Sequence, residues 1–145
     1  MSDKQSFLSK QDEETIVDAI KQAEKNTSGE IRVHIEGHTD KDHFEHALEV
    51  FQRLEMHKTE LRNGVLIYIA VEDHQFVILG DDGINKVVAD DFWDKTRDVM
   101  QGHFKQGDFK TGIVDGILQA GKELKAHFPY QEDDTNELSN EISKS

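Results

Sequence analysis

The stretch Val65-Leu66-Ile67-Tyr68-Ile69-Ala70-Val71 is the longest apolar run of the chain and is rich in β-branched residues. A continuous apolar run of this kind is typical of a strand that is buried on both faces of a sheet. It is too short for a bilayer, which a helix crosses with about 20 apolar residues. The run therefore predicts the central strand of an α/β domain.

A second strand follows the central one almost at once. Only Glu72-Asp73-His74 separates the run from the strand predicted over residues 75–79. So short a connection joins antiparallel strands, because a parallel crossover needs a dozen residues or more. This strand ends at Gly80-Asp81-Asp82-Gly83, the acidic loop that we expect to carry the working surface.

Residues 30–36 predict a further strand upstream, because apolar and polar residues alternate strictly along them. The polar residues are Arg32, His34 and Glu36. They predict that one face of this strand is more exposed to solvent and that the strand lies near the edge of the sheet. Phe44, Ala47, Leu48, Phe51 and Leu54 recur at helical spacing before the central strand. A crossover through this helix predicts that the two strands it joins are parallel.

Three more helices complete the predicted fold. The first follows a capping pair, Ser9 with Asp12, and ends near Asn26. Another begins at Asp90 and Asp91, and the last covers residues 109–126. On the last helix a row of small residues predicts close packing: Gly112, Gly116 and Ala120. We therefore expect a three-layer α/β/α sandwich, with a small mixed sheet of a parallel pair and an antiparallel hairpin strand, flanked by about four helices.

Length and composition predict one domain. We expect a flexible N-terminus over residues 1–8, a folded domain over 9–129 and a disordered acidic tail over 130–145. The chain has 145 residues and a net charge of −13, which argues against nucleic acid as a partner. It has no cysteine, so disulfides and thiolate chemistry are excluded. Without an apolar leader or spanning segment, we expect a monomer in the cytoplasm with no membrane insertion.

Strand direction predicts where the acidic residues meet. The third strand runs opposite to the other two, so its end lies beside their beginnings. One rim then gathers the carboxylates of Glu30, Asp81, Asp82, Asp90 and Asp91, together with Arg62 and Asn63. Carboxylates so placed are neutralised well by Ca²⁺ or Mg²⁺, which take oxygen ligands. The alternative is that Asp81 and Asp82 form a turn and Asp90 and Asp91 cap a helix.

The eight histidines offer a competing zinc hypothesis. His43 and His46 lie three residues apart on a predicted helix, and His57 follows it. The spacing indicates no third ligand, so we favour histidines on the protein surface over a zinc site. His34 and His74 are no stronger candidates for zinc ligands. The EF-hand pattern, a phosphate-binding glycine loop and a nucleophile elbow are absent.

Four motifs taken together resemble the TPM domain family, which is named for a thylakoid protein, a photosystem-associated protein and a nematode receptor regulator. They are Arg62-Asn63-Gly64, Gly80-Asp81-Asp82-Gly83, Asp90-Asp91-Phe92-Trp93 and Phe104-Lys105-Gln106-Gly107-Asp108. The resemblance extends over residues 16–124. It implies the same three-layer fold, an acid phosphatase activity and a divalent cation at an acidic cluster. The matching positions are Asp81, Asp82, Asp91 and Glu30, whereas Asp90 is a candidate from topology alone.

Three functions remain open from the sequence. The first is a domain that binds Ca²⁺ or Mg²⁺ in a structural or regulatory role. The second is a metal-dependent phosphatase acting on phosphomonoesters, in which metal-bound water attacks and Asp91 or Glu30 acts as general base. The third is a protein-interaction module that uses the rim and the tail.

Overall fold

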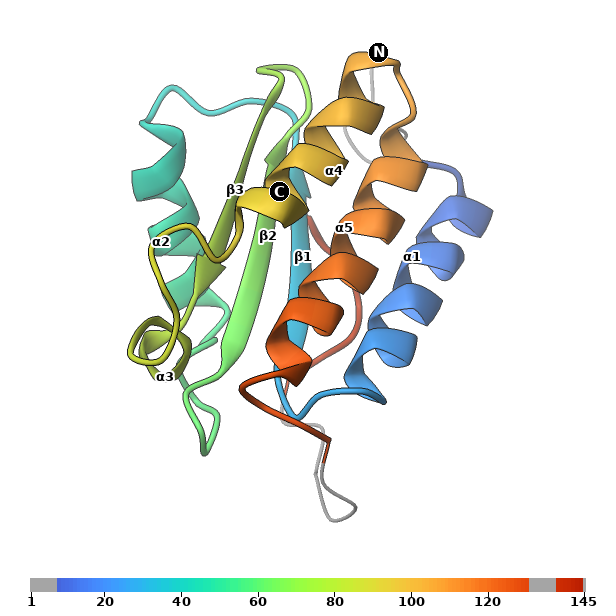
Figure 1. The fold of residues 1–145 in the computed structure, drawn as a ribbon. Coiled ribbons are helices and arrows are strands. Elements are labelled where there is room, and N and C mark those ends of the chain that lie inside the picture. The colour runs from blue at the N-terminus through green and yellow to red at the C-terminus, as the bar shows by residue number, and fades with distance from the viewer. Residues whose placement is uncertain (1–7, 131–137, 145) are drawn as a thin grey trace.

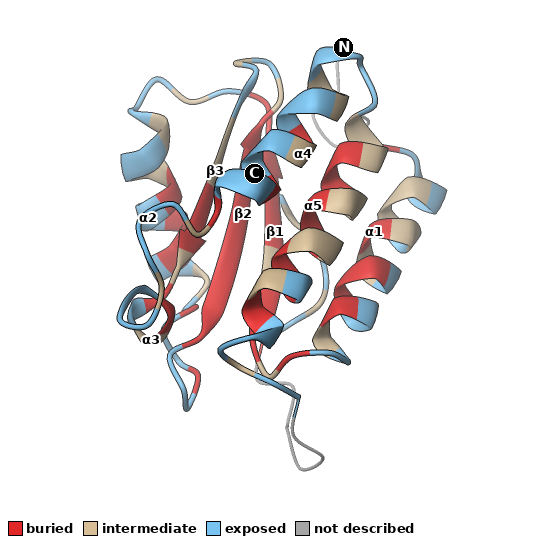
Figure 2. Ribbon diagram, in the orientation of Figure 1, coloured by how far each residue is buried: buried red, intermediate tan, exposed pale blue. Residues whose placement is uncertain are grey.

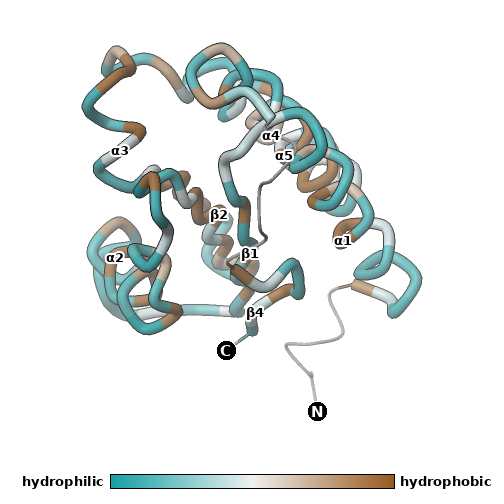
Figure 3. Tube along the Cα trace, turned by 90° about the horizontal axis from the view of Figure 1, so that it is seen from below, coloured by the Kyte–Doolittle hydropathy of each residue, from teal (hydrophilic) through white to brown (hydrophobic). Residues whose placement is uncertain are grey.

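The computed structural model describes residues 8–130 and 138–144. They form a sheet with helices on both faces, as Figure 1 shows. The elements are α1 (Lys10–Glu24), β1 (Glu30–Glu36), α2 (His43–Arg53), β2 (Gly64–Ala70), β3 (Gln75–Gly80), α3 (Asp82–Asn85), α4 (Asp94–Lys105), α5 (Phe109–Lys125) and β4 (Ser143–Lys144). The view in Figure 3 separates the layers, with α2 on one side of the sheet and α1, α4 and α5 on the other. The α/β fold predicted from the sequence is confirmed.

The sheet has the strand order β3-β2-β1-β4. Strands β1 and β2 are parallel, with Glu30 opposite Gly64 and Glu36 opposite Ala70. Strand β3 is antiparallel to β2, and its last residue, Gly80, pairs with Val65. The end of β3 therefore lies beside the beginnings of β1 and β2, as the short hairpin predicted.

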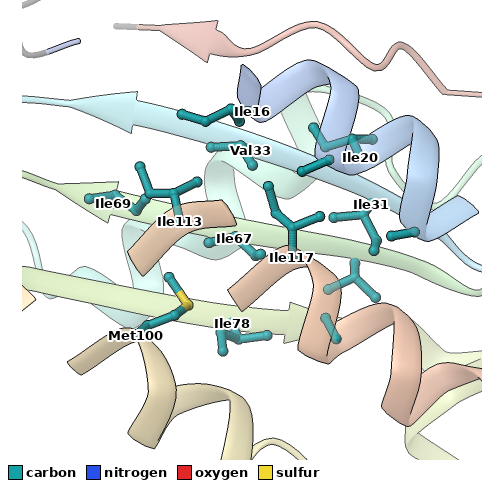
Figure 4. Close-up of a cluster of buried hydrophobic side chains, with 14 of the residues drawn as sticks. Ile16, Ile20, Ile31, Val33, Ile67, Ile69, Ile78, Met100, Ile113 and Ile117 are labelled. Carbon is teal, nitrogen blue, oxygen red and sulfur yellow. The ribbon is translucent and has the colours of Figure 1, made fainter. Parts of the chain in front are cut away.

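Strand β2 forms the centre of the core, and each of its residues is buried (Figure 2). Val65, Ile67 and Ile69 pack toward α1 and α5, where Figure 4 shows Ile67 and Ile69 facing Ile113 and Ile117. The alternate residues Leu66, Tyr68 and Ala70 pack on the side of α2. The run is continuously apolar because both of its faces are covered by helices.

Helices α4 and α5 approach closely through the small residues of α5. A Cβ atom added to Gly116 would lie 2.5 Å from Cγ of Met100, and one added to Gly112 would lie 2.5 Å from Cε1 of Phe104. These distances are shorter than ordinary contacts, so no larger residue fits without movement. The row of small residues is a packing device, as its spacing predicted.

Local structure differs from the prediction after β3. The acidic loop continues into the short helix α3, and α4 begins at Asp94 rather than at Asp90. Its N-cap residue, Trp93, makes no side-chain capping hydrogen bond. Asp90 and Asp91 therefore lie in the turn before α4 and not at its N-cap, and Phe92 and Trp93, whose rings meet edge to face, follow them in that turn.

The C-terminal segment also differs from the prediction where it is described. Ser143 and Lys144 pair with His34 and Ile35 of β1, and Leu138 is buried. Strand β1 is therefore an interior strand instead of an edge strand. Residues 1–7, 131–137 and 145 lie outside the described residues, so the flexible N-terminus and the rest of the predicted tail stay predictions. Within the described parts, no helix is both long and apolar enough to cross a membrane.

Candidate functional site

Backbone hydrogen bonds join the three segments of the predicted rim. The amide of Asp81 donates to the carbonyl of Gly64 at 2.9 Å, and the amide of Gly83 donates to the carbonyl of Arg62 at 2.9 Å. The amide of Glu30 donates to the carbonyl of Asn63 at 3.3 Å. The starts of β1 and β2 and the end of β3 thus form one rigid junction, at the lower end of the sheet in Figure 1.

Asp81 is held by Arg62 in a two-point ion pair. Nε of Arg62 donates to Oδ2 at 2.8 Å and Nη2 donates to Oδ1 at 2.9 Å. The amide of Asp82 also donates to Oδ1 at 2.7 Å, so Asp81 caps α3. Arg62 has a φ of 52°, in the left-handed region, and the junction holds it there. The Asp81 carboxylate is buried and anchors the loop to the sheet.

The other three aspartates of the rim are exposed. Asp82 approaches Arg62 only at 3.5 Å and its side chain is 68% exposed. The carboxylates of Asp90 and Asp91 contact no partner among the described residues. Within residues 8–130 and 138–144, no group of three or more acidic or histidine side chains already converges as a metal site does. These aspartates lie on one segment of the chain, and the structure does not close them around a point.

Glu30 and Asn63 are turned into the protein. Glu30 is buried, and its Oε1 accepts from the amide of Leu138 at 2.6 Å. Asn63 donates from Nδ2 to the carbonyl of Ser28 at 3.2 Å. Both side chains therefore join the rim to neighbouring segments: Glu30 to the C-terminal segment and Asn63 to the turn before β1.

A further carboxylate at this end of the molecule was missed. Glu24, in the last turn of α1, accepts from the amide of Ile31 with Oε2 at 3.0 Å. Burial raises the pKa of this carboxyl to about 7, and the hydrogen bond from Ile31 opposes the rise. No sequence signal marks it, because a glutamate near a helix end is ordinarily solvated.

We expect Glu24→Gln to raise the free energy of unfolding at pH 8 by about 1–3 kcal/mol. The folded state binds the Glu24 proton more tightly than the unfolded state, since the folded pKa is the higher one. The contribution of Glu24 to the free energy of unfolding is thus fully present below the pKa of the unfolded state, and it is lost as the pH rises through about 7. Urea unfolding at pH 8 and pH 4 measures the effect.

Glu14→Gln is the matched control, because Glu14 lies exposed on the same helix. It should change stability by less than about 0.5 kcal/mol at either pH. The two glutamine variants should become equally stable at pH 4, where Glu24 is protonated in both states. An equal response of both variants at pH 8 would contradict a raised pKa at Glu24.

The opposite end of the sheet holds a buried polar cluster around Glu36. The hydroxyl of Tyr68 donates to Oε2 of Glu36. Nε2 of His34 lies 3.2 Å from Oε1, and Nε2 of His46 lies 3.0 Å from Oε2. Nδ1 of His34 reaches Oγ of Ser143 at 2.9 Å. The cluster joins β1 to β2, to α2 and to β4.

The prediction of surface histidines is wrong for two members of this cluster. The side chains of His34 and His46 are only 1% and 13% exposed. Burial lowers the pKa of His34, against the effect of Glu36. At Glu36 burial alone would raise the pKa, but the hydrogen bonds from Tyr68, His34 and His46 outweigh it and hold the pKa below its ordinary value. The register pairing His34 with Tyr68 places these groups together.

Asp73 forms a second cluster beside the first. Its carboxylate lies 2.5 Å from Nδ1 of His38 and 2.9 Å from Nε2 of His43, and the amide of Thr39 donates to it at 3.1 Å. Hydrogen bonds from His38, His43 and Thr39 hold the pKa of Asp73 well below its ordinary value. The carboxylate of Asp73 thus engages one ring nitrogen each of His38 and His43, and the contact with His43 ties the β2–β3 turn to the start of α2.

Comparison with known proteins identifies relatives along the whole chain. A BA42 protein from the psychrophilic bacterium Bizionia argentinensis, solved by NMR, is 58% identical, with a TM-score of 0.94 and full coverage of both chains. The N-terminal domain of a P. gingivalis protein is 17% identical, with a TM-score of 0.70, over 87% of this chain and 82% of that one. The N-terminal domain of the cg2496 protein from Corynebacterium glutamicum is 14% identical, with a TM-score of 0.63, over 95% of this chain and 81% of that one.

The two distant structures share the fold alone. No protein with a curated description matches the chain. The TPM domain profile matches residues 1–123, a span that contains the sheet junction and the acidic rim. The chain belongs to the TPM domain family.

Proposed function

We propose that this domain binds a divalent cation, Ca²⁺ or Mg²⁺, on the rim segment of residues 80–91, in a structural or regulatory role. The observation that carries the proposal is the exposure of Asp82, Asp90 and Asp91 on one short segment. Arg62, the basic side chain beside Asp82, is already engaged by Asp81, and Lys86, on the segment itself, is exposed. Like charges on one segment repel each other unless a cation neutralises them.

The roles within this proposal follow from the contacts. Asp81 keeps the segment anchored, because its two oxygens are bonded to Arg62 and to the amide of Asp82. Asp82, Asp90 and Asp91 supply exposed oxygen ligands, and the cation would compete with Arg62 for Asp82. Ca²⁺ takes six to eight oxygens and accepts flexible geometry, so carbonyls of the turn and water would complete the shell. Cation binding would draw the turn before α4 toward α3.

A cation that binds only the folded state should raise the thermal midpoint of the protein. At a concentration about 100 times Kd, the gain in the free energy of unfolding is about 2.7 kcal/mol. Isothermal calorimetry with CaCl₂ and MgCl₂ measures binding directly. Thermal unfolding with and without a chelator measures how far the cation raises the thermal midpoint. No heat and no shift at millimolar cation would overturn the proposal.

The double variant Asp90→Asn with Asp91→Asn tests the ligands. We expect its affinity for the cation to fall by at least about tenfold, since two charged ligands are lost. Asp18→Asn is the control, because Asp18 is an exposed aspartate of α1, outside the rim. Equal affinities for the double variant and the control would place the cation elsewhere.

A phosphatase activity would depend on the same cation, because metal-bound water is the attacking group that the rim residues suit. Turnover of a phosphomonoester that is lost on chelation and in the double variant would extend the proposal to catalysis. Turnover that survives both changes would come from another site.

A further inference from the structure

A cavity of about 480 Å³ lies at the end of the sheet opposite to the rim. It opens between the β2–β3 hairpin and the connection from α4 to α5, two segments that lie together at the top of Figure 1. Ligand cavities of small molecules have volumes of about 300–1,000 Å³. The residues that carry the inference are Val71, Phe76, Gln101, Phe104, Lys105 and Phe109.

Three aromatic rings form the apolar wall of this cavity. Phe76 meets Phe104 edge to face with ring centroids 5.4 Å apart, and Phe104 lies 5.1 Å from Phe109. All three side chains are only partly buried, so their rings meet solvent in the cavity. Packing a planar apolar group against them would remove that surface from water, which is favourable.

The described lining of the cavity lacks the acidic side chains that dominate the protein. The chain carries a net charge of −13, yet no aspartate or glutamate lines the cavity. Lys105, an exposed side chain at the end of α4, is the one lysine or arginine in the described lining. Helix α5 begins at Phe109, in the lining, and its N-cap residue Asp108 makes no side-chain capping hydrogen bond. Free amides at a helix start add positive potential, which the exposed carboxylate of Asp108, outside the lining, partly offsets.

We propose that this cavity binds a small aromatic monocarboxylate. The planar body packs against Phe76, Phe104 and Phe109, and the carboxylate pairs with Lys105 near the start of α5. A neutral ligand would lose the ion pair, and a dicarboxylate would meet the negative field of the surrounding protein. The site is separate from the rim, so its test does not depend on the cation.

Titration of the full-length chain with indole-3-acetate, followed by amide NMR shifts, tests the proposal. We expect saturable shifts at residues 74–76 and 104–109, with a Kd on the order of 1 mM or below for a ligand of this size. Indole-3-acetamide is the neutral probe of the same shape, and it should bind about fivefold more weakly, the effect of one partly exposed charge pair.

Lys105→Gln should lower the affinity for indole-3-acetate by about fivefold and leave the affinity for indole-3-acetamide unchanged. Lys95→Gln is the matched control, because Lys95 is exposed on the same helix and lies outside the lining. Three outcomes would overturn the proposal: shifts confined to other residues, equal affinity for the two probes, or equal effects of the two lysine variants. Gln101→Trp, which fills the cavity from an exposed position, should abolish binding of both probes.

Discussion

Gly83→Ala is expected to lower the free energy of unfolding by about 3 kcal/mol, because the added methyl group overlaps rigid backbone. A Cβ atom at this position would lie 2.1 Å from the carbonyl oxygen of Leu61 and 2.6 Å from that of Arg62. The two loops of the rim cross here, and the amide of Gly83 bonds to Arg62. The alanine must push the loops apart, so urea unfolding should show the loss and cation affinity should fall with it.

Gly102→Ala is the opposite case on the same chain. Gly102 lies inside α4, and nothing stands within 4 Å of its added Cβ atom. Alanine is the better helix former, so the free energy of unfolding should rise by about 0.5–1 kcal/mol. A Gly83→Ala variant that is as stable as the unmodified protein would show that the loops do not cross as closely as described.

Glu36→Leu should have an effect of similar size, about 3 kcal/mol of lost stability. The carboxylate of Glu36 is 4% exposed and accepts from Tyr68 while His34 and His46 face it. Removing it takes away the acceptor of the buried Tyr68 hydroxyl and the carboxylate that faces Nε2 of His34 and of His46. The loss of one buried polar partner costs about 1–3 kcal/mol. Denaturant unfolding at pH 7 measures the total.

The same variant should also respond less to acid. The pKa of Glu36 is held below its ordinary value, so its contribution is present above the unfolded pKa and is lost as the pH falls through the folded pKa. Glu45→Leu on the exposed face of α2 is the control, and should change stability by less than about 0.5 kcal/mol. If Glu36→Leu were equally harmless, the cluster would not hold α2 on the sheet.

The sequence was sufficient for the fold because its strongest signals are local. A continuous apolar run needs cover on both faces, and a three-residue break makes a hairpin, so strand directions followed without further information. Those directions placed the acidic loop beside the starts of β1 and β2, which the hydrogen bonds of Asp81 and Gly83 confirm. The positions of Gly112 and Gly116 likewise indicated close helix packing.

Other features were out of reach of the sequence because they depend on distant partners. Alternation showed that His34 and Glu36 share a face of β1, but not that α2 and Tyr68 cover that face. The pairing of β4 with β1 joins segments more than 100 residues apart, such as His34 and Ser143 at a separation of 109. Spacing could not show that Arg62 would take up Asp81 and leave the other aspartates exposed.

The sequence by itself thus determined the layers, the strand directions and the meeting of the acidic loop with the starts of β1 and β2, because each follows from periodicity and connection length. The tertiary structure decided which of those carboxylates are free. Asp81, Glu30 and Glu24 are engaged by groups that packing brings to them, whereas Asp82, Asp90 and Asp91 stay open to solvent. The burial of a side chain and its hydrogen-bond partners depend on how the layers pack together, whereas the periodicity of the sequence indicates only on which face of a helix or strand the side chain lies.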